Sequence, residues 1–261
     1  MKKIFNLSKI IILLNLFLIL ILFFLSKKLN TDINLDKIFM PISSENLLGT
    51  DDLGRDILSL LIVGAIKTLK VVLISVSISF FIGSFLGMTS GYFENNLSIF
   101  IKSLVDLMMI VPSLISAIII SSIFGINPIT AGMTLGIFGI GSYMNQAEAL
   151  TKREKNKEYI EASIILGVPQ PIILYKNIFF NILPQLLINL GNTASSVILQ
   201  YSALSFIGLG ADYTKPDWGT MLYQYRIYLI KKPFLIIFPS LAIFWVSLSF
   251  NLLFDKEKVY E

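Results

Sequence analysis

The sequence predicts an all-α integral membrane protein, and three observations support this class. Hydrophobic residues make up 55% of the 261 positions, and the mean hydropathy is +0.77. Charged residues make up only 15%, which is too few for the hydrated surface of a soluble domain of this size. The charges also fall in blocks and leave long uncharged tracts between them. That pattern is typical of a chain that crosses a bilayer several times.

The N-terminal segment predicts a first membrane helix over residues 10–26. A basic stretch at residues 1–9 precedes an aliphatic run. A signal peptide is the alternative, but the sequence Ser26-Lys27-Lys28 offers no small-residue cleavage site. We therefore expect an uncleaved helix whose flanking lysines reach the interface. Residues 26–65 are polar and mixed, so a loop outside the lipid is expected to follow.

The remaining uncharged tracts predict five further spans. The tract between Asp106 and Glu148 is about twice the length that one span needs, and the turn signal Gly125-Ile126-Asn127-Pro128 divides it. The loop after the fifth span contains Trp218, whose ring suits a membrane–water interface. With the first helix, the six spans fall at roughly residues 10–26, 67–91, 99–124, 128–147, 184–210 and 234–253.

These spans divide the chain into three parts. Residues 1–66 contain the N-terminal helix and its external loop, and residues 67–254 form the core domain. The core contains one long polar loop, at residues 148–183, and residues 255–261 form a short tail.

Composition excludes several classes of function. The chain has no cysteine and no histidine, so disulfides, thiolate catalysis, Cys/His zinc sites and imidazole proton relays are ruled out. The net charge of +4 comes without a basic patch interleaved with aromatic residues. We therefore expect no nucleic-acid partner, but lysines and arginines that border the lipid bilayer. We expect no cofactor and no metal site, and the absence of G-x-x-x-x-G-K-[ST] means that the chain cannot hold ATP phosphates.

The spans offer few groups for ion coupling or catalysis. Asp106 lies near a span end, four residues after Lys102, and an ion pair between them is expected. A secondary transporter or channel would need midplane acids, broken helices or pore charges, and an intramembrane enzyme would need catalytic groups that are missing. Gly83, Gly87 and Gly91 share one helix face, which we expect to pack within this chain and not against a second subunit.

Residues 46–59 (NLLGTDDLGRDILS), which follow the first helix, contain two glycines and a group of charged residues. Asp52 is expected to cap a helix that starts immediately after it, while Asp51 and Arg55 are one helical turn apart and can pair. The three carboxylates of Asp51, Asp52 and Asp56 leave a cation site as the alternative.

Residues 158–171 (EYIEASIILGVPQP) interrupt the apolar chain with charges, a glycine and two prolines. The first half can form about two helical turns, ended by Gly167 in the left-handed conformation. Pro169 and Pro171 are expected to hold the residues before them extended and so to form a rigid elbow. A second amphipathic segment follows at 172–183. Because so short a helix is not stable alone, we expect it to lie in a partner's groove or at the membrane interface.

Charge alone leaves the orientation open. With both termini in the cytoplasm, lysines and arginines divide eleven to ten between the two sides, which barely discriminates under the positive-inside rule. The basic N-terminus favours a cytoplasmic N-terminus, because the first helix usually dominates.

Three segments resemble one protein family. The pattern Glu161-Ala162-Ser163-x-x-x-Gly167 resembles the EAA motif of bacterial ABC importer permeases. The stretches LSFIGLG, DWGTML and PSLAIFWVSLSFNLL resemble the end of the second-type permease subunit in the dipeptide/oligopeptide/nickel branch. The chain departs from the family at Asn177-Ile178-Phe179-Phe180, where a His-x-Leu-Pro group is usual, and in its short tail. The LGTDxxGRDxxS segment of that branch is similar to residues Gly49, Thr50, Asp51, Gly54, Arg55 and Asp56.

The resemblance implies a type I ABC importer permease fold with a cytoplasmic coupling-helix loop. It implies a homologous permease as heterodimer partner, two ABC ATPase subunits that hydrolyse ATP, and an extracytoplasmic substrate-binding protein. The location would be the bacterial inner membrane, with both termini cytoplasmic. Di- or oligopeptides would be the substrate, with nickel or metal-chelate import as the alternative. The residues implied to couple to the ATPase are Glu158, Glu161, Ala162, Ser163, Gly167 and Pro169.

Overall fold

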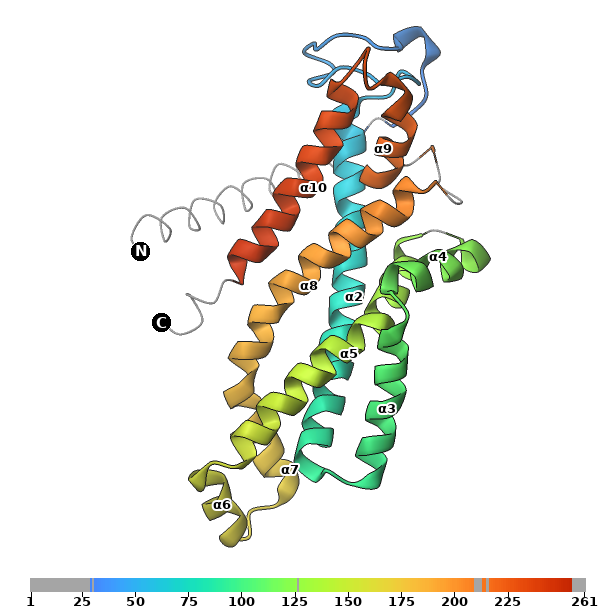
Figure 1. Cartoon of the computed structure of the whole chain (residues 1–261). Helices are drawn as coiled ribbons and strands as arrows, with labels where there is room; N and C mark the ends of the chain where they lie inside the picture. The colour runs from blue at the N-terminus through green and yellow to red at the C-terminus, as the bar shows by residue number, and fades with distance from the viewer. Residues whose placement is uncertain (1–28, 30, 126, 209–212, 215, 255–261) are drawn as a thin grey trace.

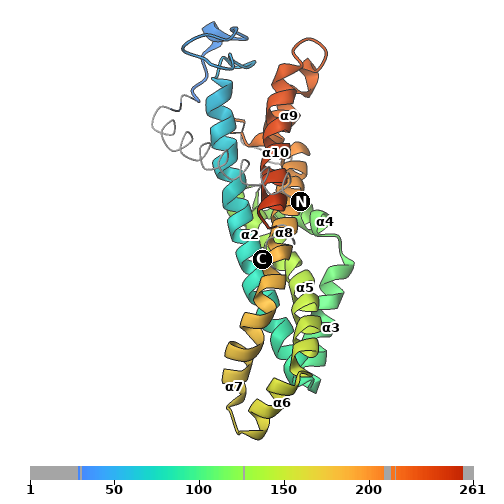
Figure 2. The same cartoon turned by 90° about the vertical axis from the view of Figure 1, so that its left-hand side faces the viewer.

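Helices account for most of the described chain, and in the computed structural model they form an elongated bundle (Figures 1 and 2). The structure describes residues 29, 31–125, 127–208, 213–214 and 216–254, so the predicted span 10–26 and the tail 255–261 lie outside the described residues. In chain order the elements are η2 (Leu35–Lys37), α2 (Ile57–Phe93), α3 (Asn96–Ile110), α4 (Ser113–Phe124), α5 (Pro128–Lys155), α6 (Glu158–Ile165), α7 (Gln170–Ile172), η3 (Ile173–Phe179), α8 (Phe180–Phe206), α9 (Trp218–Tyr225), η4 (Arg226–Tyr228) and α10 (Phe234–Leu253).

By length and composition, three of the described helical runs are able to cross a membrane: Ile57–Phe93, Gln170–Phe206 and Phe234–Leu253. Helices α3 and α4 together make a fourth if the bent pair counts as one span. The predicted span 234–253 coincides with α10. The other boundaries were less accurate, because α2 begins at Ile57 inside the predicted loop and α5 continues eight residues beyond the predicted end of its span, to Lys155.

Residues 99–124 do not form the single straight helix that was predicted. Helix α3 ends at Ile110 and α4 begins at Ser113, and the two axes differ by 81°. Pro112 lies between them and confines Val111 to an extended conformation, with ψ at 122°. Proline therefore breaks this span, and α4 turns away from α3 at the right of Figure 1.

Helices α2 and α5 pack closely along their length, and glycines make this approach possible. A methyl group at Gly83 would lie 2.6 Å from the carbonyl oxygen of Ile140, and one at Gly91 would lie 2.7 Å from that of Glu148. The two backbones therefore come nearer than any larger side chain would allow. This confirms that the Gly83, Gly87 and Gly91 face packs within the chain.

Helix α9 is fixed to the upper end of the bundle by a buried acid. Asp217 caps α9 by accepting a hydrogen bond from the Thr220 amide at 2.9 Å, and it also accepts one from the Tyr201 hydroxyl of α8 at 2.8 Å. Trp218 is 2% exposed, and its Nε1 donates to the carbonyl oxygen of Leu61 at 3.0 Å. The prediction that Trp218 lies at a membrane–water interface is therefore wrong, because its ring packs between α9 and α2.

Two buried apolar clusters hold the bundle together. The upper cluster joins α2, α4, α5, α8, α9 and α10. The lower cluster includes Tyr143 of α5, Ile160 of α6, and Ile173, Ile178 and Ile182 of the run that leads into α8. The short helix α6 is thus attached through the lower cluster, at the end of the molecule opposite the loop before α2 (Figure 1).

Candidate functional site

Helix α6, at the lower end of the bundle, has the length and the ending that the sequence predicted. Glu158 and Glu161 lie in its first turn, where negative charge is favourable at a helix N-terminus. Gly167 has φ of +73°. Its amide donates to the carbonyl of Ile164 at 3.0 Å, and the Val168 amide donates to that of Ser163 at 3.1 Å. These are the two hydrogen bonds of a Schellman motif, so Gly167 is confirmed as the helix-ending residue.

The inner face of α6 is tied to two longer helices. Ile160 is fully buried in the lower apolar cluster. The Tyr159 hydroxyl donates to the Glu154 carboxylate at the end of α5 and accepts a hydrogen bond from Asn181 Nδ2 of α8 at 2.7 Å. Burial, and then the Glu154 carboxylate, raise the pKa of Tyr159 to about 12, so the hydroxyl stays protonated. In addition, Ser163 Oγ accepts from Asn177 Nδ2 at 3.2 Å.

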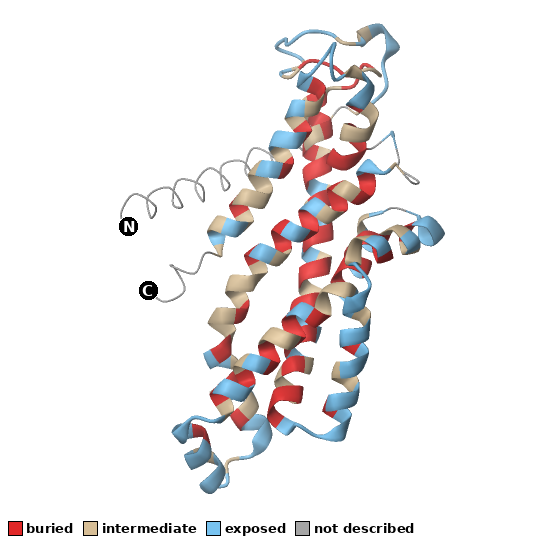
Figure 3. Ribbon diagram, in the orientation of Figure 1, coloured by how far each residue is buried: buried red, intermediate tan, exposed pale blue. Residues whose placement is uncertain are grey.

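Helix α6 has an exposed outer face (Figure 3), which carries acidic and apolar residues. Glu158, Glu161 and Ala162 are exposed. At the end of the helix, Ile165 is 84% exposed and Leu166 is 81% exposed. Adjacent exposed apolar residues rimmed by acids are typical of a surface that another protein covers. We refer to Glu158, Glu161, Ala162, Ile164, Ile165 and Leu166 as the α6 outer face.

The chain re-enters the bundle differently from the prediction. Pro169 is extended, with ψ at 134°, but Gln170 is already helical and Pro171 lies in the first turn of α7. A proline is tolerated there, because the amide it lacks has no helical acceptor. The segment predicted as a separate helix at 172–183 continues through the π-helical stretch η3 into α8. The chain therefore enters α8 with no second elbow after Pro169.

Ion pairs join the lower part of α5 to α3. Glu148 is buried and pairs with Lys102 at 2.6 Å and with Lys152 at 2.8 Å. Burial opposes its charge, but the hydrogen bonds from the two lysines outweigh that effect and hold the pKa of Glu148 below its usual value. The predicted Lys102–Asp106 pair is wrong, because Lys102 reaches across to α5 while Asp106 is exposed on α3.

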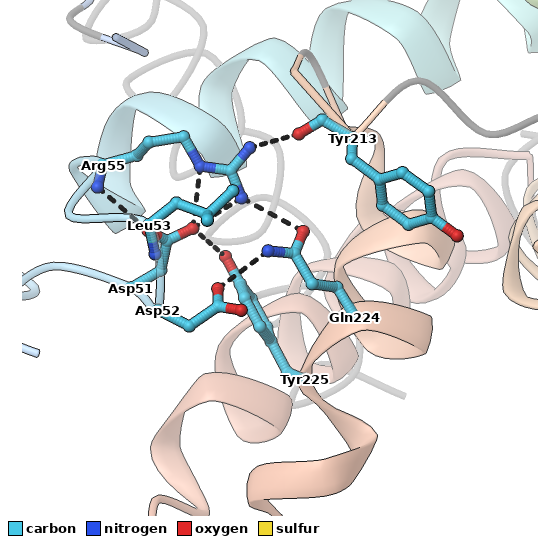
Figure 4. Close-up of polar contacts among 7 residues, drawn as sticks. All are labelled: Asp51, Asp52, Leu53, Arg55, Tyr213, Gln224 and Tyr225. Carbon is cyan, nitrogen blue, oxygen red and sulfur yellow. Dashed lines mark hydrogen bonds and ion pairs between the residues drawn. The ribbon is translucent and has the colours of Figure 1, made fainter. Parts of the chain in front are cut away.

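At the opposite end, a buried ion pair organises the loop before α2 (Figure 4). Arg55 and Asp51 are both fully buried, with Nη2 and Oδ2 2.6 Å apart and Nε and Oδ2 2.9 Å apart. The Tyr225 hydroxyl of α9 donates to the same Oδ2 at 2.9 Å. Burial, and then the Asp51 charge, raise the pKa of Tyr225 well above its usual value. The predicted Asp51–Arg55 pair is confirmed, although it lies in a loop and not on a helix.

Further hydrogen bonds connect this loop to α9. Arg55 donates from Nη2 to Gln224 Oε1 at 3.1 Å and from Nη1 to the carbonyl of Tyr213. Gln224 Nε2 in turn donates to Asp52 Oδ1 at 2.7 Å. The carboxylate of Asp52 therefore bonds to α9. The prediction that it caps a helix is wrong. We refer to Asp51, Asp52, Arg55, Tyr213, Gln224 and Tyr225 as the Arg55 cluster.

The remaining predicted residues of this loop shape its backbone. Asp56 caps α2 by accepting from the Ser59 amide at 2.9 Å, which places the helix start four residues later than predicted. Gly49 and Gly54 have φ of +76° and +71°, and Thr50 Oγ1 accepts from the Met40 amide at 2.8 Å. Among the described residues, no group of three acidic side chains is arranged to hold a metal ion. The cation-site alternative therefore has no geometric support there.

The structure also identifies residues that sequence reasoning missed. Tyr159, Asn177 and Asn181 attach α6, while Gln224 and Tyr225 complete the Arg55 cluster. Tyr159 and Asn181 are 22 positions apart, and Asp51 and Tyr225 are 174 positions apart. No local pattern could pair residues at such separations, because only the packing of α6 and α9 brings them together.

Comparison with known proteins agrees with this architecture. Residues 79–256 match the family model described as binding-protein-dependent transport system inner membrane component. The chain is 35% identical to the di/tripeptide transport system permease protein DppC of Pseudomonas aeruginosa, over 80% of this chain and 69% of that protein. It is 34% identical to the dipeptide transport system permease protein DppC of Haemophilus influenzae, over 80% of this chain and 71% of that protein.

A third relative has a different named substrate. The glutathione transport system permease protein GsiD of Pectobacterium atrosepticum is 33% identical, over 82% of this chain and 71% of that protein. The family match covers more than half of the chain, and the helical bundle described above is the architecture expected of a membrane component. The chain therefore belongs to the binding-protein-dependent transport system inner membrane component family, the permeases of ABC importers.

Proposed function

We propose that this permease imports di- or oligopeptides, driven by ATPase subunits that dock on the α6 outer face. The observation that carries the proposal is the division of α6 into two faces. Tyr159, Ile160 and Ser163 attach it to α5, η3 and α8, while its acids and its terminal apolar residues are exposed. A helix held from one side and uncovered on the other is suited to receive a partner and to pass a displacement to the bundle.

In this proposal α6 faces the cytoplasm, and so do both termini. The core domain at 67–254 provides membrane helices two to six of a type I importer fold, the first helix lies at 10–26, and residues 148–183 form the coupling loop. Helix α5 is the remaining one of the six proposed membrane spans. It is included because it packs beside α2 over its length. Residues 26–56 and 212–232, with the Arg55 cluster, then face outward, toward a substrate-binding protein. The transport pathway lies between this chain and a homologous permease.

The proposed roles follow from the positions of the predicted residues. Glu158, Glu161 and Ala162 contact the ATPase, Ser163 holds α6 against η3, and Gly167 and Pro169 set the path by which the chain leaves α6. ATP binding and hydrolysis would take place entirely on the ATPase subunits, and the permease itself would be no enzyme. The names of the three relatives reported above support peptides as the substrate.

Reconstitution tests this proposal. The permease, its partner permease, both ATPases and the binding protein would be placed in proteoliposomes with ATP, and uptake of a labelled dipeptide and of nickel would be compared. Dipeptide uptake and ATPase retention that Glu161→Lys abolishes, while Glu45→Lys at the opposite end leaves ATPase retention intact, support both the substrate and the docking face. Nickel uptake without dipeptide uptake would contradict the substrate, and full uptake by Glu161→Lys would contradict the docking face.

A further inference from the structure

Helix α8 carries a polar face without any charge. No Asp, Glu, Lys or Arg occurs in Phe180–Phe206, yet amide and hydroxyl side chains recur every three or four residues along it. Residues at this spacing share one face of a helix. None of them is buried within the chain. This α8 polar face consists of Gln185, Asn189, Asn192, Ser196 and Gln200.

The exposed faces of α2 and α3 are mostly apolar. On α2 the exposed residues include Phe81 and Phe85, and on α3 they include Phe100 and Leu107. Such side chains are suited to lipid. An amide in hydrocarbon without a hydrogen-bond partner costs about 2–7 kcal/mol, so a row of amides is not suited to the same surroundings.

Neighbouring residues satisfy only part of this polar face. Asn189 Nδ2 donates to Gln146 Oε1 at 3.0 Å, and Gln200 accepts from Ser113 Oγ at 2.7 Å. The side chain of Asn192 is exposed and has no hydrogen bond to any described residue. The middle of the face therefore leaves hydrogen-bonding groups open to water or to a molecule outside this chain.

A groove beside the α8 polar face adds further uncharged polar groups. Helix α10 lies beside α8 (Figure 1). An open groove of about 440 Å³ is lined mostly by apolar side chains, Leu199 of α8 among them, together with Ser240, Ser247 and Asn251 of α10. These three polar residues are seven and four positions apart, so they lie on one face of α10. The groove is thus an uncharged, mostly apolar hollow that carries a row of polar groups on its α10 side.

We propose that the α8 polar face and the groove beside it line the water-filled passage for peptides. This rests on the peptide import proposed above. Amide and hydroxyl groups both donate and accept hydrogen bonds, and so they complement the N–H and C=O groups that every peptide bond carries. The absence of charge from α8 and α10 means that neither acidic nor basic peptide side chains are repelled. Such a surface suits peptides of varied sequence, held by their backbones.

The competing occupant is a helix of the partner permease packed directly on this face, because polar side chains also join membrane helices. Water distinguishes the two, since a packed interface is dry and a passage is wet. The chain contains no cysteine, so single cysteines can be introduced without removing others. Suitable positions are Asn192→Cys and Ser196→Cys on the face, with Phe85→Cys and Leu107→Cys on the apolar faces as matched controls.

The experiment uses the complete transporter in proteoliposomes, with cysteine-free partner subunits and a charged methanethiosulfonate reagent. The reagent reacts only with the thiolate form of cysteine. A dry environment raises the pKa of the thiol, and each pKa unit of that rise lowers the thiolate fraction about tenfold. We expect the two face cysteines to react at least about tenfold faster than the controls. We also expect a transported dipeptide with ATP and binding protein to slow their reaction severalfold, in variants that still import peptide.

Equal, slow labelling of the face and control cysteines would overturn the proposal in favour of a dry interface. Fast labelling that an imported dipeptide does not slow would overturn the peptide passage. Dipeptide uptake by the unsubstituted transporter is measured first, so that failure of the proposed substrate is seen separately from failure of the passage.

Discussion

The two ends of this permease carry similar residue types but use them in opposite ways. At the upper end, Asp51 and Arg55 are fully buried and paired with each other. At the lower end, Glu158 and Glu161 are exposed beside the exposed Ile165. Each end also has a glycine with positive φ, Gly54 at the upper end and Gly167 at the lower end.

This difference indicates what each motif does. A charged pair removed from water needs its partner within the chain, so the Arg55 cluster fixes the permease's own fold by attaching the loop before α2 to α9. Exposed acids and apolar side chains add little to the fold and remain available to another protein. Substitutions at the upper end should therefore alter stability, and those at the lower end should alter transport.

The largest effect is expected from Arg55→Met. The substitution leaves the Asp51 carboxylate buried without its cation, which typically costs about 3–5 kcal/mol. The free energy of unfolding in detergent should fall accordingly and the yield of folded permease should drop. Lys37→Met breaks an exposed pair, with the Lys37 and Glu45 side chains 42% and 77% exposed, and should leave the stability nearly unchanged. Equal stability of the two variants would contradict the structural role.

Gly167→Val should impair transport while the ATPases stay bound. A methyl group at Gly167 would meet nothing within 4 Å, so the penalty arises from the positive φ alone and is about 1–3 kcal/mol. The path from α6 to α7 should therefore shift, and dipeptide uptake per ATP hydrolysed should fall severalfold. Gly167→Asn should retain more activity, because asparagine tolerates this conformation.

A matched control for that variant exists in the turn before α5. Gly125 has φ of +80° and also has open space around it, but it is far from α6 in the chain. Gly125→Val should lower stability by a similar amount without changing the coupling ratio. Normal uptake by Gly167→Val would show that the ending of α6 is not needed for coupling.

A smaller effect is expected from Tyr159→Phe. The variant keeps the ring but removes the hydroxyl between Glu154 and Asn181, a net loss of about 1–2 kcal/mol at the attachment of α6. Hydrogen exchange of α6 amides should become faster. Tyr175→Phe is the control, because Tyr175 is 60% exposed and stacks on Phe179 without a hydrogen bond to a described residue. Unchanged exchange in Tyr159→Phe would mean that apolar burial alone holds α6.

The smallest expected effect is a pH dependence that differs between the ends. The pKa of Glu148 is lowered from 4.5, so its contribution to stability is complete above that pH and is lost as the pH falls through the folded value. Burial raises the pKa of Asp52 from 3.8, so its contribution is present at low pH and is lost as the pH rises through its folded value.

Hydrogen exchange at pH 6 and pH 4, corrected for the intrinsic rate, measures this difference. The contact between α3 and α5 around Glu148 should lose protection at pH 4, and Glu148→Gln should reduce that change. A uniform loss of protection at both ends would contradict the assignment.

Much of the fold was predictable because membrane helices leave a strong local signal. The span at 234–253, the glycine face of α2, the ending of α6 at Gly167 and the Asp51–Arg55 pair are all confirmed. Each of these depends on residues close in sequence. Pro112 was also visible in the sequence, but the uncharged tract around it concealed the break that it causes.

The errors share a physical cause, which is packing between distant segments. Trp218 fits an interface by its chemistry but is buried against α2, and Lys102 pairs across helices with Glu148 and not along α3 with Asp106. The residue that caps α2 is Asp56 and not Asp52 as predicted, because the Asp52 carboxylate accepts a hydrogen bond from Gln224 of α9. The partner in each case lies more than 40 positions away, beyond the reach of periodicity and spacing.

Retention of ATPase subunits by two surface variants tests the contrast between the ends most directly. Ile165 is 84% exposed on the α6 outer face, and Ile230 is 95% exposed at the opposite end. Ile165→Asp should keep its thermal stability but lose the ATPases on co-purification and lose dipeptide uptake. Ile230→Asp, on the side proposed to face the binding protein, should keep the ATPases. If Ile165→Asp retained the ATPases and full uptake, the α6 outer face could not be where the ATPases dock.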